Sequence, residues 1–302
     1  MNILQMNCFV FLLCSILINI LFIKLAKEWP QFMKEWLKIE CLMGYFGTRK
    51  TLKKNMDFIF TSLTLFTIVE HMLMELYRVI DSVECSKTVG DGIRHYYVNV
   101  TFPHLFTSLV NYTLWKALIF HISNFQTTFC WTFGDTFIIL LSTAFATQMK
   151  QSRTKVKVLV KSQIKAATPW RKIREEHCGL LNLCRLLDQK ISYLVLVSFC
   201  SNLYFVLVQL FNALRPMSDI LQKAYFFISF GFLIFRIIYV SLSAASINDE
   251  SRKLLIELLL TPPELYNVEI ERLINQITYK TAAISGKSFF IITRGLILKV
   301  SN

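Results

Sequence analysis

Long apolar stretches constrain this chain more than any other feature of its sequence. Six of them are long enough, or nearly so, to cross a membrane, because a helix needs about 20 apolar residues to span the hydrocarbon core. A seventh begins near Phe289 and continues to the end of the sequence. The six stretches are residues 8–25, 57–77, 102–122, 129–147, 192–211 and 224–246. They predict a polytopic membrane protein with an all-α helix bundle.

Composition supports the same class. Apolar residues make up 54% of the chain and charged residues only 18%, whereas a soluble domain carries about 25% charged residues. Disorder is excluded because its mark is low hydrophobicity. Residues 8–25 lack the basic n-region and small-residue cleavage site of a signal peptide, so we interpret them as a membrane helix.

Motifs for catalysis, metal binding and cofactors are absent from the sequence. No GxSxG, HExxH or phosphate-binding loop occurs, and the five histidines are scattered. The eight cysteines form no CxxC pair and show no zinc spacing. We therefore expect neither an enzyme nor a metal site, a cofactor or a disulfide framework.

Basic residues divide the segments between the apolar stretches into two groups. Lys and Arg number eight in residues 24–56, eleven in 150–190 and five in 247–288, against three in 78–101 and two in 214–223. Segments rich in Lys and Arg stay in the cytoplasm. We predict that the first three segments lie inside and the last two outside. Topology then accounts for the net charge of +13 without a nucleic-acid partner.

The stretches 102–122 and 129–147 must together give a single net crossing. If both crossed, the most basic segment of the chain would lie outside, against the positive-inside rule. The first of them contains Pro103 and several polar residues. We expect it to be an outer helix or the outer extension of the next helix. The sequons at Asn99 and Asn111 are candidate glycosylation sites and agree with an outer location.

Two inner segments have amphipathic or basic character. Trp29, Phe32 and Trp36 recur at helical spacing, which is typical of an interfacial anchor or of a helix that packs on a partner helix. Residues 150–174 carry nine basic side chains. These could bind anionic membrane lipid or could serve topology alone.

Polar side chains inside the apolar stretches are candidate ligand contacts, because such groups are costly in a bilayer and usually functional. Either Asp135 or Glu70 can pair with Arg236 as a clamp between helices. Alternatively, the polar groups line a hydrated pocket that opens outward, supported by aromatic residues near the outer helix ends. Aromatic residues are also typical of the interfacial belt. The candidate ligand-binding residues are Glu70, His71, Trp131, Asp135, Asn202, Tyr204, Gln209, Tyr225 and Arg236.

Several blocks of sequence resemble conserved blocks of one family. Residues 129–142, FCWTFGDTFIILLS, are similar to the W-N-F-x-D-L-F-I helix of insect gustatory receptors of the sugar clade, with Thr132 in place of the Asn. The other similar blocks follow in the same order along the chain: LAKEWP at 25–30, VEH at 69–71, ISYLVLVSFCSNLYF at 191–205, SAASINDES at 243–251 and ISGKSFFIITR at 284–294.

The resemblance implies a seven-transmembrane insect chemoreceptor bundle, with the inverted topology relative to G-protein-coupled receptors that the charges also predict. It implies a sugar-gated cation channel of the plasma membrane, a homo- or hetero-tetramer with other gustatory receptor subunits, and an outer ligand pocket. The family's first helix and its T-Y-x5-Q-F block in the seventh have no counterpart here. We therefore expect the chain to lack the first and last transmembrane helices and not to conduct ions by itself.

Other functions remain open at this level. A transporter or a G-protein-coupled type of receptor would also be polytopic, and a truncated receptor would be non-functional. The inverted topology argues against the G-protein-coupled type. A transporter is expected to show internal repeats or matched broken helices, and the sequence has neither.

Overall fold

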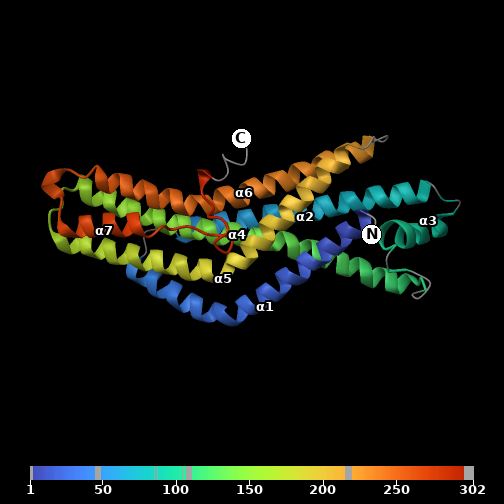
Figure 1. Cartoon of the computed structure of the whole chain (residues 1–302), viewed down its shortest axis with the longest axis horizontal. Coiled ribbons are helices and arrows are strands. Elements are labelled where there is room, and N and C mark those ends of the chain that lie inside the picture. Colours follow the sequence, from blue (N-terminus) through green and yellow to red (C-terminus); the bar gives the residue numbers. More distant parts are fainter. Residues whose placement is uncertain are drawn as a thin grey trace. The chain divides into compact units, whose positions relative to one another are not determined.

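A computed structural model describes residues 3–44, 49–84, 86, 88–103, 105–106, 111–214 and 220–295. In this part of the chain, helices and turns make up the structure, and an isolated antiparallel bridge joins Ser285 to Ile291 (Figure 1). The helices are α1 (Ile3–Met43), α2 (Arg49–Glu84), α3 (Val89–His95), η1 (Tyr96–Thr101), α4 (Leu114–Lys161), α5 (Ala167–Ala213), α6 (Ile220–Leu259), η2 (Pro263–Leu265) and α7 (Val268–Tyr279).

Within the described residues, five helices are long and apolar enough to cross a membrane. They are the segments Met6–Met43, Lys50–Val83, Leu114–Lys161, Ala167–Ala213 and Gln222–Leu259. Large apolar side chains such as Phe9 and Phe58 are 58% and 72% exposed, which suits contact with lipid. The all-α polytopic membrane bundle predicted from the apolar stretches is confirmed.

Helix α4 explains the single net crossing expected from the third and fourth stretches. It begins at Leu114 and has 48 residues, so residues 114–122 are an extension of the helix that contains 129–147. A helix of this length is about 72 Å long at 1.5 Å per residue, more than twice the ~30 Å hydrocarbon core. Only part of α4 can therefore lie in the hydrocarbon.

The place of the basic segment 150–190 between two apolar stretches predicts a loop. This prediction is wrong, because the segment is mostly helical. It consists of the end of α4, a turn at residues 162–166 and the start of α5. Gln163 has a left-handed φ of 47° in that turn, where the Ile164 N–H bonds the Leu159 carbonyl at 3.2 Å and satisfies one terminal carbonyl of α4. Helices α4 and α5 extend through this segment because its apolar side chains, such as Val156 and Trp170, pack in a cluster with other helices.

Two compact units emerge from the contacts along the chain. Unit 1 consists of residues 1–19, 61–134 and 200–236, and unit 2 of residues 20–60, 135–199 and 237–302. The chain therefore passes between the units within its long helices. The segments predicted to lie inside belong almost entirely to unit 2, and those predicted outside belong to unit 1.

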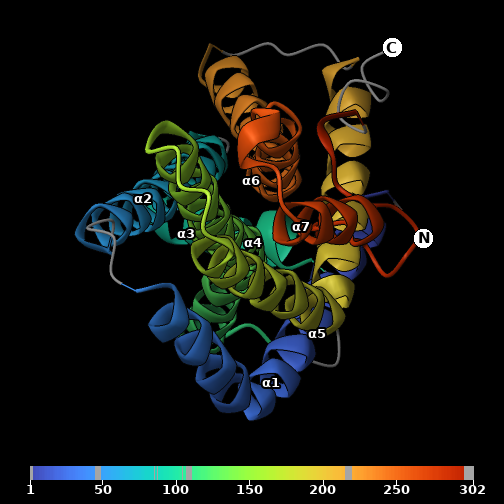
Figure 2. The ribbon, with the colours of Figure 1, turned by 90° about the vertical axis from the view of Figure 1, so that its left-hand side faces the viewer.

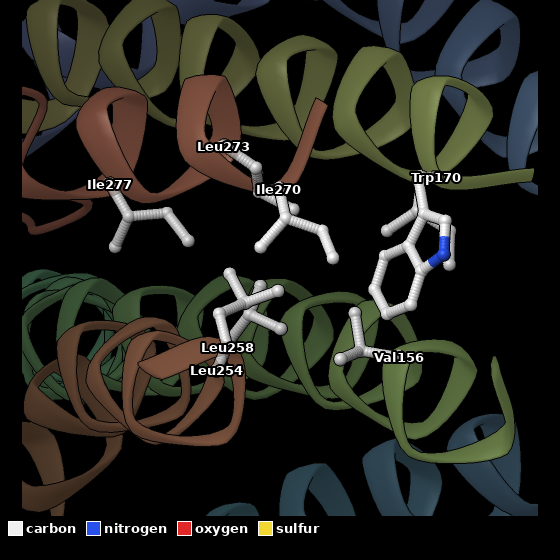
Figure 3. Close-up of a cluster of buried hydrophobic side chains, with 8 residues drawn as sticks. Val156, Trp170, Leu254, Leu258, Ile270, Leu273 and Ile277 are labelled. Carbon is white, nitrogen blue, oxygen red and sulfur yellow. The ribbon is translucent and has the colours of Figure 1, made fainter. Parts of the chain in front are cut away.

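The core of unit 2 joins four helices. Figure 2 looks along these helices, and Figure 3 shows the side chains between them. Trp170, 1% exposed, lies in the same cluster as apolar residues of α7. The buried members of this cluster are Val156 of α4, Trp170 and Ile173 of α5, Leu254 and Leu258 of α6, and Ile270, Leu273 and Ile277 of α7. Asn267 caps α7 by accepting the N–H groups of Glu269 and Ile270 at 3.0 and 3.2 Å.

The aromatic residues after the first apolar stretch pack on a partner helix, which was one of the two expectations for them. They belong to α1, which continues past Pro30. The Trp29 ring lies 5.6 Å from Phe137 of α4, and Trp36 meets Phe145 edge-on at 4.7 Å. These contacts join α1 to α4 within unit 2.

The seventh apolar stretch does not start as a helix near Phe289. Residues 284–292 instead form a tight turn in which the Gly286 N–H bonds the Phe290 carbonyl at 2.9 Å. Lys287 and Ser288 both have positive φ, 49° and 64°, as a turn of this kind requires. Residues 296–302 lie outside the described part of the chain.

Candidate functional site

A cavity of about 290 Å³ lies within unit 1. Helices α1, α2, α4, α5 and α6 and the segment around η1 all contribute to its lining. The residues that line it are Asn7, Cys8, Phe11, Glu70, His71, Met74, Arg78, Val100, Thr101, Pro103, Asn124, Thr128, Trp131, Thr132, Phe205, Gln209, Tyr225, Ser229, Phe232, Leu233 and Arg236. Six of the nine candidate ligand residues are among them, although those six are far apart in sequence.

Aromatic rings form one wall of the cavity. Trp131 lies 6.0 Å from Phe11, edge-on, and 4.9 Å from Phe205. The indole Nε1 donates to the Ser201 hydroxyl at 3.3 Å, so the ring is held from three sides. A fixed aromatic ring of this kind offers a flat apolar face to a ligand.

Arg236 is both a clamp between helices and part of the cavity wall. Its side chain, 2% exposed, donates to Thr132 Oγ1 and to Asn202 Oδ1 at 3.0 Å each. The guanidinium carbon lies 4.0 Å above the Trp131 ring, within the range of a cation–π contact. Arg236 thus joins α6 to α4 and α5 through Thr132 and Asn202, whereas the sequence had offered the carboxylates of Asp135 or Glu70 as its partners, and it lines the cavity as well.

Carboxylate, amide and phenol groups supply the polar part of the lining. Glu70 accepts a hydrogen bond from the Ser229 hydroxyl at 2.7 Å, which links α2 to α6. Tyr225 stacks on Tyr77 with ring centroids 6.2 Å apart. Together with Gln209, these side chains surround the cavity with donors and acceptors.

Behind the cavity wall, the Tyr96 hydroxyl of η1 donates to a carboxylate oxygen of Glu75. Burial, together with this acceptor, raises the pKa of Tyr96 above its ordinary range. The phenol therefore stays protonated and keeps donating. This bond ties η1 to α2 beside His71, which lines the cavity.

Three of the candidate ligand residues do not line this cavity. Two of them support residues that do: Asn202 binds Arg236, and the Tyr204 hydroxyl donates to Asn7 Oδ1 at 2.7 Å. Asp135, fully buried, belongs to unit 2, where it accepts a hydrogen bond from the Ser198 hydroxyl. The glycosylation candidates Asn99 and Asn111 are both exposed.

The reasoning from sequence missed several lining residues, although helical spacing carries a signal for them. Met74 and Arg78 follow Glu70 at intervals of four residues, so they share its face of α2. Asn124 and Thr128 precede Trp131 by seven and three residues, which also places them on its face of α4. No group of three or more His, Cys, Asp or Glu side chains in the described residues is placed to hold a metal ion.

Comparison with known proteins gives a consistent family. The family model described as trehalose receptor matches residues 1–302. The chain is 30% identical over 289 residues to the gustatory receptor for sugar taste 64f of Drosophila melanogaster, covering 95% of this chain and 61% of the relative. It is 28% identical over 283 residues to the gustatory receptor 5a for trehalose of the same organism, covering 93% and 63%. The chain thus spans less than two thirds of the length of these two relatives.

Solved structures show the same fold. The insect olfactory receptor OR5 from Machilis hrabei superposes with a TM-score of 0.71 at 13% identity, covering 98% of this chain and 76% of that one. Its complex with eugenol gives a TM-score of 0.69. Since the family model matches from residue 1 to residue 302 and the bundle is that of an insect chemoreceptor, the chain belongs to the trehalose receptor family, the sugar clade of the insect gustatory receptors, whose members are receptors and not enzymes.

Proposed function

We propose that this chain is a sugar-responsive subunit of a gustatory receptor in the plasma membrane, with the unit 1 cavity as its ligand site. The observation that carries the proposal is the combination of an aromatic wall around Trp131 with polar groups such as Glu70 and Gln209 in one cavity. Family membership supports sugar as the ligand class, because the relatives are named for sugar taste and for trehalose.

The chemistry of the lining suits a sugar. A sugar has a weakly apolar ring face and many hydroxyl groups, so a selective site needs an aromatic face and buried donors and acceptors. Trp131 offers the face, while Glu70 accepts and Gln209 both donates and accepts. The volume of about 290 Å³ is near the lower end of the ~300–1,000 Å³ typical of small-molecule pockets.

A response to sugar requires the receptor to adopt two conformations with different affinities for the ligand. We propose that the sugar shifts this equilibrium in a cation channel formed as a homo- or hetero-tetramer with other gustatory receptor subunits. Arg236 is placed to couple the two events, since it lines the cavity and also binds Thr132 of α4 and Asn202 of α5.

Equilibrium binding of trehalose and sucrose to the purified chain in lipid nanodiscs tests the ligand site. Trp131→Ala removes the aromatic wall and is expected to lower affinity at least about tenfold, equivalent to about 1.4 kcal/mol. Trp131→Phe keeps a ring and should lose less. The matched control is Trp115→Ala, because Trp115 lies on the same helix, is 61% exposed and does not line the cavity. Equal affinity in wild type and Trp131→Ala, with intact folding, would remove the cavity as the sugar site.

A further inference from the structure

His71 is buried in the cavity wall, where no described residue forms a hydrogen bond with its ring. Its side chain is 1% exposed, and neither Nδ1 nor Nε2 makes a hydrogen bond to any described residue. A neutral imidazole has one donor and one acceptor, and leaving both unmet in a buried place is costly. A ligand hydroxyl, which donates and accepts, is the complementary group for such a side chain.

A carboxylate, Glu75, lies close to His71 on the same helix. Glu75 Oε1 lies 3.8 Å from His71 Nε2, too far for a hydrogen bond but within range of a charge pair. This oxygen makes no hydrogen bond to a described residue, while the other Glu75 oxygen accepts from Tyr96. Glu75 does not line the cavity.

Other charged and titratable groups surround this histidine. Arg78 lies 4.0 Å from Glu75 and weakens its pull on a proton at His71, and the His121 ring is centred 6.4 Å from His71. The groups of this kind on the elements around His71 are Cys8 of α1, Glu70, Glu75 and Arg78 of α2, Tyr96 and Tyr97 of η1, His121 of α4, and Tyr225 and Arg236 of α6.

We propose that neutral His71 hydrogen-bonds a hydroxyl of the bound sugar, and that protons compete with the sugar for this side chain. The proposal rests on the proposed sugar site and adds its regulation by pH. Histidine is suited to this role because its ordinary charge change falls between about pH 5 and pH 8.

Protonation changes what His71 can bind. In the neutral ring one nitrogen accepts from a ligand hydroxyl or the other donates to it; after a proton is taken up from solution, both nitrogens only donate. In the charged ring, Nε2 carries a proton and lies 3.8 Å from the carboxylate oxygen of Glu75. The charge pair favours a ring turned toward Glu75, and the acceptor for the sugar hydroxyl is lost. Acid therefore weakens sugar binding.

Trehalose binding to the chain in nanodiscs, measured between pH 7.5 and pH 5, tests the proposal. Wild-type affinity should fall as the pH is lowered, because protons compete with the sugar for the acceptor nitrogen of His71. His71→Asn and His71→Gln keep a donor and an acceptor but cannot titrate. Whatever their affinity at pH 7.5, it should not change with pH between 7.5 and 5.

His121→Gln is the matched control. It removes the neighbouring histidine of the pair, which does not line the cavity, so it should keep the pH profile of the wild type. The proposal would be overturned if trehalose affinity no longer depended on pH in His121→Gln but still depended on pH in both His71 variants. It would also be overturned by pH-independent wild-type binding that Trp131→Ala still weakens. Failure of the sugar site itself has a different signature, since Trp131→Ala would then leave affinity unchanged at every pH.

Discussion

Buried polar groups connect helices in both units, but in unit 1 they also line the candidate ligand cavity. In unit 2 these groups connect helices: Lys155 pairs with Glu176 at 2.5 Å, and Arg153 pairs with Glu250 at 2.9 Å. In unit 1 they surround an open volume of about 290 Å³, and His71 has no hydrogen-bond partner among the described residues. Groups left unmet around a cavity are typical of a functional site, which natural proteins retain at a cost in stability. The difference supports the proposal that unit 1 binds the ligand and that unit 2 is the scaffold.

A cysteine-labelling experiment tests whether the segments of the two units lie on the predicted sides of the membrane. Unit 1 contains the segments predicted outside and unit 2 almost all of those predicted inside, so cysteines placed at Asn99 and Ser162 should differ in access. Both positions are exposed. In a background without other reactive cysteines, an impermeant thiol reagent on intact cells should label Asn99→Cys and not Ser162→Cys. The reverse result would invert the topology and restore a G-protein-coupled type of receptor as the alternative.

The scaffold role of unit 2 predicts the largest loss of stability among single substitutions. Trp170→Ala removes the indole from the cluster between α4 and α7 and its bond to the Ile164 carbonyl at 2.9 Å (Figure 3). The cost is expected to be about 3–5 kcal/mol. Trp115→Ala, at a 61% exposed position, should stay within about 0.5 kcal/mol of wild type. Thermal unfolding in detergent, followed by size-exclusion chromatography, measures the stability of both variants. Equal losses in Trp170→Ala and Trp115→Ala would contradict the scaffold role of the unit 2 cluster.

The membrane bundle was predictable because a crossing has a minimum length in apolar residues. That rule, combined with the counts of Lys and Arg, predicted one net crossing for the third and fourth stretches, and residues 114–122 and 129–147 do lie in the single helix α4. The same rule treated residues 150–190 as a connection between helices, and for the helical pattern after residue 25 it left open whether the partner is the membrane surface or another helix. Both segments are helical because Trp170, Phe32 and similar side chains pack on other helices, and a short apolar pattern does not reveal its partner.

Part of the candidate site was predictable for a related reason. Polar groups in a bilayer are costly, so Glu70, His71 and Arg236 stood out in the sequence. Arg78 lies near the end of the apolar stretch and did not stand out, although it shares a helix face with Glu70. The partners of Arg236, and the assignment of Asp135 to unit 2, depend on how distant helices pack, which the spacing along one helix does not specify.

A smaller loss of stability is expected where the turn at residues 284–292 binds α5. Asp188 accepts the Ser285 backbone N–H at 2.6 Å and the Ser285 hydroxyl at 3.0–3.1 Å. Asp188→Ala leaves that N–H without its charged acceptor and should cost about 1.5–3 kcal/mol. Ser285→Ala removes only the hydroxyl and should cost about 0.5–1.5 kcal/mol. Limited proteolysis within residues 280–292 and thermal unfolding measure the two, and a larger effect of Ser285→Ala would contradict this account.

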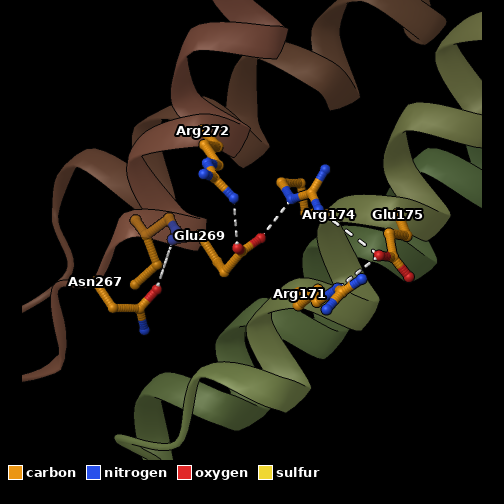
Figure 4. A network of polar contacts seen from close by, with 7 residues as sticks. Arg171, Arg174, Glu175, Asn267, Glu269 and Arg272 are labelled. Carbon is orange, nitrogen blue, oxygen red and sulfur yellow. Dashed lines mark hydrogen bonds and ion pairs between the residues drawn. The ribbon is translucent and has the colours of Figure 1, made fainter.

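The smallest effect is expected at the ion-pair network at the start of α7 (Figure 4). Glu269 accepts from Arg174 Nε at 2.5 Å and from Arg272 at 3.0 Å, and it lies in the first turn of its helix, where a negative charge is favourable. The hydrogen bond from Arg174 lowers the pKa of the Glu269 carboxyl below its ordinary value.

The sign of the pH dependence follows from that lowered pKa. Between the folded and unfolded pKa values the unfolded chain binds more protons, so the network stabilises the fold fully above the ordinary pKa of about 4.3 and loses this contribution as pH falls through the lowered value. Glu269→Gln should therefore lower the midpoint of thermal unfolding at pH 7, with a difference from wild type that shrinks in acid and in high salt. Glu271→Gln is the matched control, because Glu271 occupies the same first turn, is exposed and forms no ion pair with a described residue. A difference for Glu269→Gln that does not shrink as the pH is lowered from 7, or one that Glu271→Gln reproduces, would contradict a stabilising role for this ion-pair network.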